Sequence, residues 1–232
     1  VILQLMKLKT LALKLLLALM LIACQSKPST SSPSTYLALG DSYTIGESVI
    51  DSLRWPNQLV AALKQNGKQF DPANIIARTG WTTDELSTAM DTTELAPPYD
   101  YVSLLIGVNN QYRGRSIENF EAEFIELLDR AIVLGDQKGT NVFVLSIPDW
   151  GVMPFAEGRD RKQIALEIDQ FNAVIQTACR DRNIAFFDIT PISREAETNP
   201  ILVANDGLHP SGEMYARWVD TLLPFFNTTG NE

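Results

Sequence analysis

Residues 36–42 read YLALGDS, an apolar run that ends in Gly40, Asp41 and Ser42. The apolar part is continuous rather than alternating, which is typical of a strand buried on both faces of a sheet. Four further short runs of this kind follow, at residues 74–78, 101–107, 141–147 and 184–189. The sequence therefore predicts five buried strands, and the first one leads directly into a polar turn.

Segments of helical period separate these runs. Their apolar residues recur every three or four positions, as in Trp55, Leu59 and Leu63. Ser116 occupies the position of a helix N-cap, and Gly135 that of a helix stop. Parallel neighbours need a crossover connection, so alternating strands and helices predict an α/β domain of three layers, with a parallel sheet between helices. We expect this single domain to span residues 36–227, followed by a short tail over 228–232.

The composition excludes several classes of function. The chain has 232 residues, of which 45% are hydrophobic and 20% charged, and its formal net charge is −9. An acidic surface repels phosphate backbones, so binding of nucleic acid by counterion release is not expected. Two cysteines cannot form a disulfide framework, and one histidine excludes zinc sites built on paired histidines.

The first 23 residues have the pattern of a signal peptide. Lysines precede an apolar run over residues 15–23, which is too short for a membrane span of roughly 20 residues. The letters LIAC at 21–24 resemble the lipobox of bacterial lipoproteins, in which the cysteine is acylated, and this predicts lipidation of Cys24. A buried cysteine ending an ordinary helix is the alternative. Residues 24–35 then form a flexible Ser/Thr/Pro tether, and the domain faces the periplasm or exterior of a bacterial cell envelope.

The second cysteine, Cys179, continues the spacing of Ile164, Ile168, Phe171 and Ile175. This spacing is the buried stripe of a helix. A thiol in the core is therefore predicted, and not a nucleophile.

Polar residues and glycines come directly after the predicted strands. In an open parallel sheet the binding crevice lies at the carboxyl ends of the strands. Ser42 follows the first strand, Gly80 the second and Asn109 the third, and Asp206 and His209 follow the fifth after a connecting stretch. We therefore expect these residues to lie at one rim of the sheet.

Together these residues suit acyl transfer. A serine hydroxyl needs an adjacent base, and His209 is the only imidazole in the chain. Asp206 would fix its tautomer and stabilise its charged form. The developing oxyanion needs donors, for which the backbone N–H groups of Ser42 and Gly80 and the amide of Asn109 are the candidates. Gly80 lacks a Cβ, so the backbone can approach the substrate closely.

The order and spacing of these motifs resemble the SGNH (GDSL) hydrolase family. The motifs are Gly40-Asp41-Ser42, Gly80, Gly107-x-Asn109 and Asp206-x-x-His209, and the similarity covers about residues 36–226. The resemblance implies a flavodoxin-like sheet in strand order 2-1-3-4-5. It also implies ester or thioester hydrolysis without a metal or other cofactor, with Ser42 as nucleophile and oxyanion donor, His209 as base and Asp206 as its orienting partner.

Two positions depart from the family pattern. Tyr43 stands where the family's short name has leucine, and Asn110 stands where aspartate is common. Asn110 is therefore assigned only support of the loop around Asn109. The competing α/β-hydrolase scaffold is disfavoured because Thr44 occupies the last position of its Gly-x-Ser-x-Gly motif.

The substrate is less well defined by the sequence. Aromatic and apolar residues near the rim could line an acyl slot or stack on a sugar, although core packing is expected for at least half of them: Trp81, Tyr112, Trp150, Met153 and Phe155. Residues 148–159 are predicted to be a specificity loop. The sequence thus predicts a membrane-tethered serine esterase for a short acyl, O-acetyl or lysophospholipid ester. An O-acyltransferase and an inactive glycan- or lipid-binding domain are the alternatives.

Overall fold

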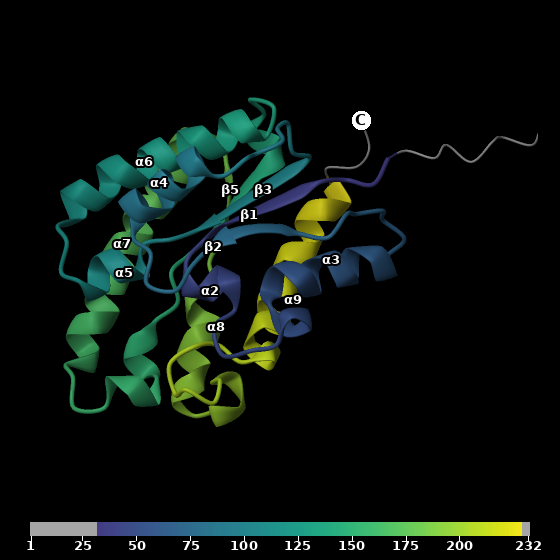
Figure 1. Ribbon diagram of the computed structural model, residues 1–232. Coiled ribbons are helices and arrows are strands. Elements are labelled where there is room, and N and C mark those ends of the chain that lie inside the picture. The colour runs from purple at the N-terminus through teal and green to yellow at the C-terminus, as the bar shows by residue number, and fades with distance from the viewer. Residues whose placement is uncertain (1–31, 229–232) are drawn as a thin grey trace, which may run out of the picture. The chain divides into compact units, whose positions relative to one another are not determined.

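The computed structural model describes residues 32–228. Within these residues, five parallel strands form one sheet in the order β2-β1-β3-β4-β5 (Figure 1). The strands are β1 (Tyr36–Gly40), β2 (Asn74–Ala77), β3 (Tyr101–Leu105), β4 (Val142–Leu145) and β5 (Ala185–Phe187). The predicted α/β class and the flavodoxin-like strand order are confirmed.

Helices cover both faces of the sheet (Figure 1). Helices α3 and α9 pack together on one face, and α4, α6 and α7 pack on the other. The helices are α2 (Ser42–Ile45), α3 (Trp55–Gln65), α4 (Thr83–Thr92), α5 (Val108–Tyr112), α6 (Ile117–Leu134), α7 (Arg161–Asp181), α8 (Thr190–Arg194) and α9 (Gly212–Thr228). Short 3₁₀ helices lie in the connections: η1 (Asp51–Leu53), η2 (Gly139–Asn141), η3 (Trp150–Val152), η4 (Pro154–Ala156), η5 (Glu195–Glu197) and η6 (Pro200–Leu202).

The central strands form the middle of the core. Leu37 on β1, Leu104 on β3 and Val144 on β4 are fully buried. Burial of each such side chain contributes about 1.5–3 kcal/mol to folding. Because helices cover both faces, these strands have no solvent side, which explains why their sequences are continuous apolar runs. The site at their carboxyl ends therefore stands on a rigid support.

Several predicted helix features are confirmed. The Ser116 hydroxyl accepts a hydrogen bond from Asn119 N at 3.2 Å and caps α6, which ends at Gly135 as predicted. Cys179 lies in the buried stripe of α7. Burial raises the pKa of its thiol to about 12, so the thiolate form is suppressed and the side chain serves packing.

The first strand ends at Gly40 as predicted, whereas the other four strands end earlier than the sequence predicted. The third strand, expected over 101–107, ends at Leu105. Gly107 has a φ of +125°, and a Cβ there would lie 2.6 Å from the Phe120 ring. The backbone can turn into α5 only with glycine at this position, so the end of the apolar run already belongs to the connection into α5, the helix that carries Asn109.

The last two residues of the predicted tether form hydrogen bonds with the domain. Ser34 and Thr35 fall in the predicted tether, but Ser34 N donates to Gln69 O at 2.8 Å and Thr35 N to Asp100 Oδ2 at 2.7 Å. The predicted signal peptide, Cys24, most of the tether and residues 229–232 lie outside the described residues. In residues 32–228, no helix combines the length and the apolar character needed to cross a membrane.

Candidate active site

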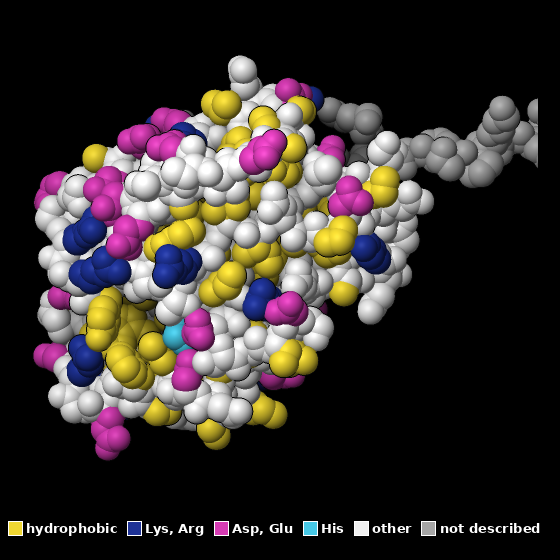
Figure 2. Space-filling model, in the orientation of Figure 1, with side chains coloured by type: hydrophobic (Ala, Val, Ile, Leu, Met, Phe, Trp, Pro, Cys, Tyr) yellow, Lys and Arg dark blue, Asp and Glu magenta, His cyan; other side chains and the backbone are white. Residues whose placement is uncertain are grey.

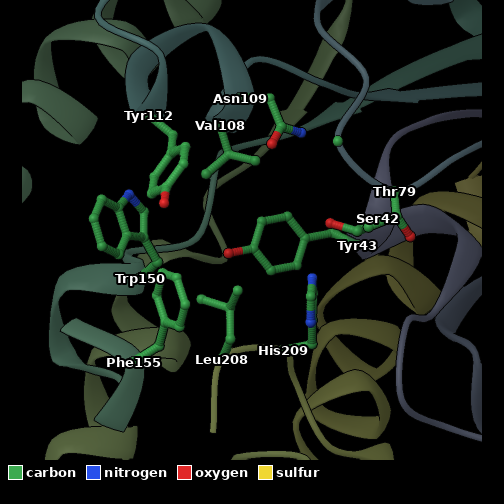
Figure 3. A pocket seen from close by; sticks show the side chains of 11 residues that line it. Ser42, Tyr43, Thr79, Val108, Asn109, Tyr112, Trp150, Phe155, Leu208 and His209 are labelled. Carbon is green, nitrogen blue, oxygen red and sulfur yellow. The ribbon is translucent and has the colours of Figure 1, made fainter. Parts of the chain in front are cut away.

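A pocket of about 170 Å³ opens at the carboxyl ends of β1, β2 and β3 (Figure 3). It brings together four of the five predicted site residues, namely Ser42, Gly80, Asn109 and His209, and the fifth, Asp206, is bonded to His209. Its other lining residues are Tyr43, Thr79, Val108, Tyr112, Trp150, Phe155 and Leu208. The expectation that residues following different strands meet at one rim is correct.

Ser42 begins the short helix α2 directly after β1. Asp41 caps this helix by accepting a hydrogen bond from Tyr43 N at 3.0 Å. A Cβ on Gly40 would lie 2.2 Å from Thr44 Oγ1 and 2.5 Å from Leu105 O. The sharp turn from strand to helix therefore requires glycine before Asp41, and it leaves Ser42 with 4% exposure at the pocket.

Asp41 is a buried carboxyl group next to Ser42. Its exposure is 0%, and burial raises its pKa to about 7, although the hydrogen bond from Tyr43 N favours the ionised form. The second carboxyl oxygen lies 3.5 Å from Asn109 Nδ2. Asp41 thus contacts both the segment that carries Ser42 and the side chain of Asn109.

His209 is held by Asp206 from the same loop. The distance from His209 Nδ1 to Asp206 Oδ2 is 2.6 Å, and Asp206 Oδ1 accepts from the backbone N–H groups of Leu208 and His209 at 2.9 and 3.0 Å. Burial opposes ionisation of Asp206, but these bonds and one from the Ser48 hydroxyl at 2.6 Å lower its pKa well below the usual range. Asp206 therefore faces the imidazole as an anion.

The other ring nitrogen of His209 is directed toward the Ser42 side chain (Figure 3). The ring of Tyr43 packs edge-on against the imidazole, with centroids 5.7 Å apart. The Tyr43 ring thus packs against His209 and limits its movement. An aromatic residue is therefore accommodated at the position after Ser42.

Two backbone donors at the pocket have no partner. The N–H groups of Ser42 and Gly80 form no hydrogen bond with any acceptor in residues 32–228. Gly80 has a φ of +87°, which favours glycine. Free N–H groups beside a serine are the arrangement that binds an oxyanion.

The amide of Asn109 is more constrained than the sequence suggested. Asn109 Nδ2 donates to Trp81 O at 2.9 Å, and its contact with Asp41 Oδ2 at 3.5 Å is long. The N–H group facing Asp41 is therefore the one available to a ligand. Neutralisation of Asp41 weakens the competing contact.

Sequence reasoning missed three residues that support the site. Arg113 Nη2 donates to Gly80 O and holds the Gly80 turn in place. Gln111 accepts from Trp150 Nε1 at 2.8 Å, and Ser48 binds Asp206. None of them follows a strand or belongs to a motif, so only their contacts in the folded chain reveal them.

Asn110 supports the neighbouring loop. It is fully buried, accepts from Thr83 N at 3.1 Å and donates to Thr83 Oγ1 at 2.6 Å. These bonds join α5 to the start of α4 and do not reach the pocket. An uncharged amide can form both bonds with Thr83, because its oxygen accepts a hydrogen bond and its nitrogen donates one.

Aromatic rings form the end of the pocket opposite Ser42 (Figure 3). Tyr112, Trp150 and Phe155 line it, and Phe155 comes from η4 in the predicted specificity loop. Met153 is fully buried, and Trp81 does not line this pocket. Three of the five candidate residues thus line the pocket, more than the sequence analysis expected.

The sequence matches the GDSL-like lipase/acylhydrolase family over residues 38–217. The chain belongs to this family. It is therefore an ester hydrolase of the SGNH type, as the motifs indicated. No curated protein was found to match it.

Several solved structures share the fold. An acetylxylan esterase, Axe2 from Geobacillus stearothermophilus, has a TM-score of 0.66 at 19% identity, covering 87% of this chain and 96% of that one. A lipolytic G-D-S-L protein from Veillonella parvula has a TM-score of 0.64 at 18% identity, covering 84% and 99%. TesA has a TM-score of 0.61 at 16% identity, covering 83% and 98%. At these identities the likeness establishes the common fold.

The described part of this GDSL-like chain holds no group of three or more His, Cys, Asp or Glu side chains arranged to bind a metal ion. Ser42 shares its pocket with the polar side chains of His209, Asn109 and Thr79 and with the backbone of Gly80.

Proposed function

We propose that Ser42, His209 and Asp206 are the catalytic triad of this ester hydrolase, and that its substrates carry a short acyl group such as acetyl. The observation that carries the proposal is the imidazole fixed by Asp206 at 2.6 Å, in one pocket with Ser42 and two unused backbone N–H groups.

The proposed reaction has two steps. In the first, His209 takes the proton of the Ser42 hydroxyl while Oγ attacks the ester carbonyl, and it then returns that proton to the leaving alcohol. In the second, a water molecule loses a proton to His209 and attacks the acyl-serine. His209 then gives that proton to Ser42 Oγ as the acid leaves, which restores the Ser42 hydroxyl and the neutral imidazole. Asp206 accepts from His209 Nδ1 throughout and stabilises the imidazolium that forms in each step.

The tetrahedral intermediate carries a negative oxygen. The N–H groups of Ser42 and Gly80 and the amide of Asn109 are the proposed donors, since all three residues line the pocket. Arg113 holds the Gly80 turn and is a positioning residue.

The size of the pocket favours a small acyl group. Its volume of about 170 Å³ is below the roughly 300–1,000 Å³ typical of pockets for drug-sized ligands. An acetyl group fits in such a space, whereas a long fatty chain would extend beyond the residues that line it. The similar solved structures include acetylxylan esterases, which supports an O-acetyl ester on a carbohydrate as the substrate class.

A panel of 4-nitrophenyl esters from acetate to palmitate tests this proposal. We expect kcat/KM to be highest for acetate or butyrate and to fall steeply with longer chains, with Ser42→Ala as the background control. Equal turnover of palmitate would contradict the short acyl group, and no release above Ser42→Ala would contradict hydrolysis. Addition of a sugar acceptor separates hydrolysis from acyl transfer, because transfer gives an acylated sugar instead of free acid.

We also propose that the protein is anchored to a bacterial envelope membrane through an acylated Cys24, on the sequence of residues 21–24 alone. Two or more acyl chains give stable anchoring. In cells fed labelled fatty acid, the full chain is expected to carry the label and Cys24→Ser to lose it. An unlabelled protein found wholly in the soluble fraction would contradict the anchor.

A further inference from the structure

The positively charged side chain of Arg159 packs against the aromatic end of the pocket. The guanidinium carbon of Arg159 lies 5.2 Å from the ring centroid of Tyr112, 5.3 Å from that of Trp150 and 5.4 Å from that of Phe155. Its Nη2 also donates to the Tyr112 hydroxyl at 3.2 Å. Arg159 lies between η4 and α7, and the same three rings line the pocket that contains Ser42. The cation is therefore fixed at the edge of the pocket wall.

Arg159 lacks the partner that most arginines of this protein have. Arg113, Arg115 and Arg194, among others, form ion pairs with Asp or Glu. Arg159 forms no ion pair with any carboxylate in residues 32–228, although the chain has a net charge of −9 and acidic side chains are plentiful. Arg78 and Arg161 also lack an ion pair in the described chain, but among its arginines Arg159 is the one whose guanidinium lies over aromatic rings.

The geometry leaves the guanidinium ready to bind an anion. The rings hold it through cation–π attraction, which restrains a side chain that otherwise loses much conformational entropy on binding. One of its five N–H groups is used by Tyr112, and the others remain for a ligand. The planar arrangement of these donors matches a carboxylate or phosphate.

The distribution of charge on the surface around the pocket also favours binding of an anion. Figure 2 shows a hydrophobic patch beside the single histidine, with Lys or Arg side chains along the margin of the patch away from the histidine. A ligand that reaches from the histidine across the patch therefore meets positive charge.

We propose that Arg159 is a specificity residue that binds an anionic group, a carboxylate or a phosphate, on the non-reacting part of the ester substrate. This rests on the proposed function, because it places the reacting ester at Ser42. The aromatic rings contact the apolar or sugar part of the substrate, between the ester at Ser42 and the anionic group at Arg159. The substrate class is thus a short acyl ester of an acidic alcohol, such as an acidic sugar or a glycerol phosphate.

The first experiment compares charged and neutral esters of the same shape. The substrates are acetate esters of 4-hydroxyphenyl acids with zero, one or two methylene groups before the carboxylate, and the corresponding amides. For the full-length protein we expect at least one spacer length at which the carboxylate has about tenfold higher kcat/KM than the amide, as suits one charge-assisted contact. Arg159→Gln should bring that ratio close to its value in uncatalysed hydrolysis.

Arg161→Gln is the matched control, because Arg161 is also exposed and forms no ion pair in the described chain, but its guanidinium lies over none of the three rings that hold Arg159. It should keep the wild-type ratio. A second arm uses 1-butyrylglycerol 3-phosphate against 1-butyrylglycerol and distinguishes a phosphate from a carboxylate. A preference in either arm that Arg159→Gln removes supports the proposal. The absence of preference in both arms, or a preference that Arg159→Gln retains, overturns it.

Binding separates this inference from the hydrolase proposal. With Ser42→Ala, calorimetric titration of each acid and its amide measures affinity without turnover. Tighter binding of the acid that disappears in the Ser42→Ala, Arg159→Gln double variant supports anion recognition even if the wild type hydrolyses none of the esters. In that case the proposed hydrolysis fails alone, whereas turnover without anion preference removes this inference alone.

Discussion

At one end of the pocket, His209 and Asp206 are joined by a 2.6 Å hydrogen bond, whereas at the other end Tyr112 and Phe155 are held by ring packing and are 45% and 43% exposed. The polar end has one geometry because several directional bonds converge on Asp206. The aromatic end permits small shifts, because dispersion contacts are individually weak and have no preferred direction. Catalysis requires the fixed geometry of the polar end, whereas binding of varied substrates tolerates the looser packing of the aromatic end.

The largest loss is expected at the polar end. His209→Ala removes the only imidazole and should lower kcat by about 10⁴ or more, since no other side chain can act as the base. Ester turnover by the folded variant measures this, with circular dichroism as the control for folding. A variant that keeps more than a few per cent of activity would show that the base is misassigned.

The next effect separates two adjacent asparagines. Asn109→Ala should lower kcat by roughly 10²–10³ with little change in KM, because the donor acts mainly on the transition state. Asn110→Ala should lose less than about tenfold, since Asn110 bonds Thr83 and not the pocket. Kinetics of both variants on one short ester compare them, and the reverse order would displace the oxyanion site by one residue.

Asp41, at the polar end, makes the stability of the folded protein depend on pH. Its pKa is raised to about 7 by burial, so the folded state holds this proton more tightly than the unfolded chain does. The group therefore stabilises the fold below about pH 4, and this contribution is lost as pH rises toward 7. Asp41→Asn removes the titration and should gain on the order of 2 kcal/mol relative to wild type between pH 5 and pH 8.

Urea unfolding at the two pH values measures this gain. Asp84→Asn is the control: burial opposes ionisation of Asp84, but Thr82 and Arg115 lower its pKa, so it stays ionised from pH 5 to pH 8. A gain for Asp41→Asn no larger than that for Asp84→Asn would mean that Asp41 is ionised in the folded protein at pH 5.

The smallest effect is expected at the aromatic end. Phe155→Ala removes part of the pocket wall and should raise KM by about tenfold, with a smaller change in kcat. Leu166→Ala, an exposed apolar residue on α7 outside the pocket, should leave both constants unchanged. If Phe155→Ala instead lowers kcat as strongly as Asn109→Ala does, the two ends are not separate in function.

Much of the site could be predicted because its residues follow strands. Ser42, Gly80 and Asn109 each come directly after an apolar run, and parallel strands bring such positions to one edge. Ser48 and Arg113 could not be predicted in this way. They lie in loops at no fixed spacing from a motif, and their partners Asp206 and Gly80 are far away in the sequence.

The sequence by itself determined the α/β class, the strands and the residues around Ser42, because apolar period and glycine positions are local properties of the chain. Only the tertiary structure decided which groups are paired and which are left free. It placed Arg159 on three rings with no ion pair to a carboxylate of residues 32–228, and it engaged one N–H of Asn109 with Trp81 O. Burial, free donors and unpaired charges depend on residues that are distant in the sequence, so they arise only when the sheet and its loops are assembled.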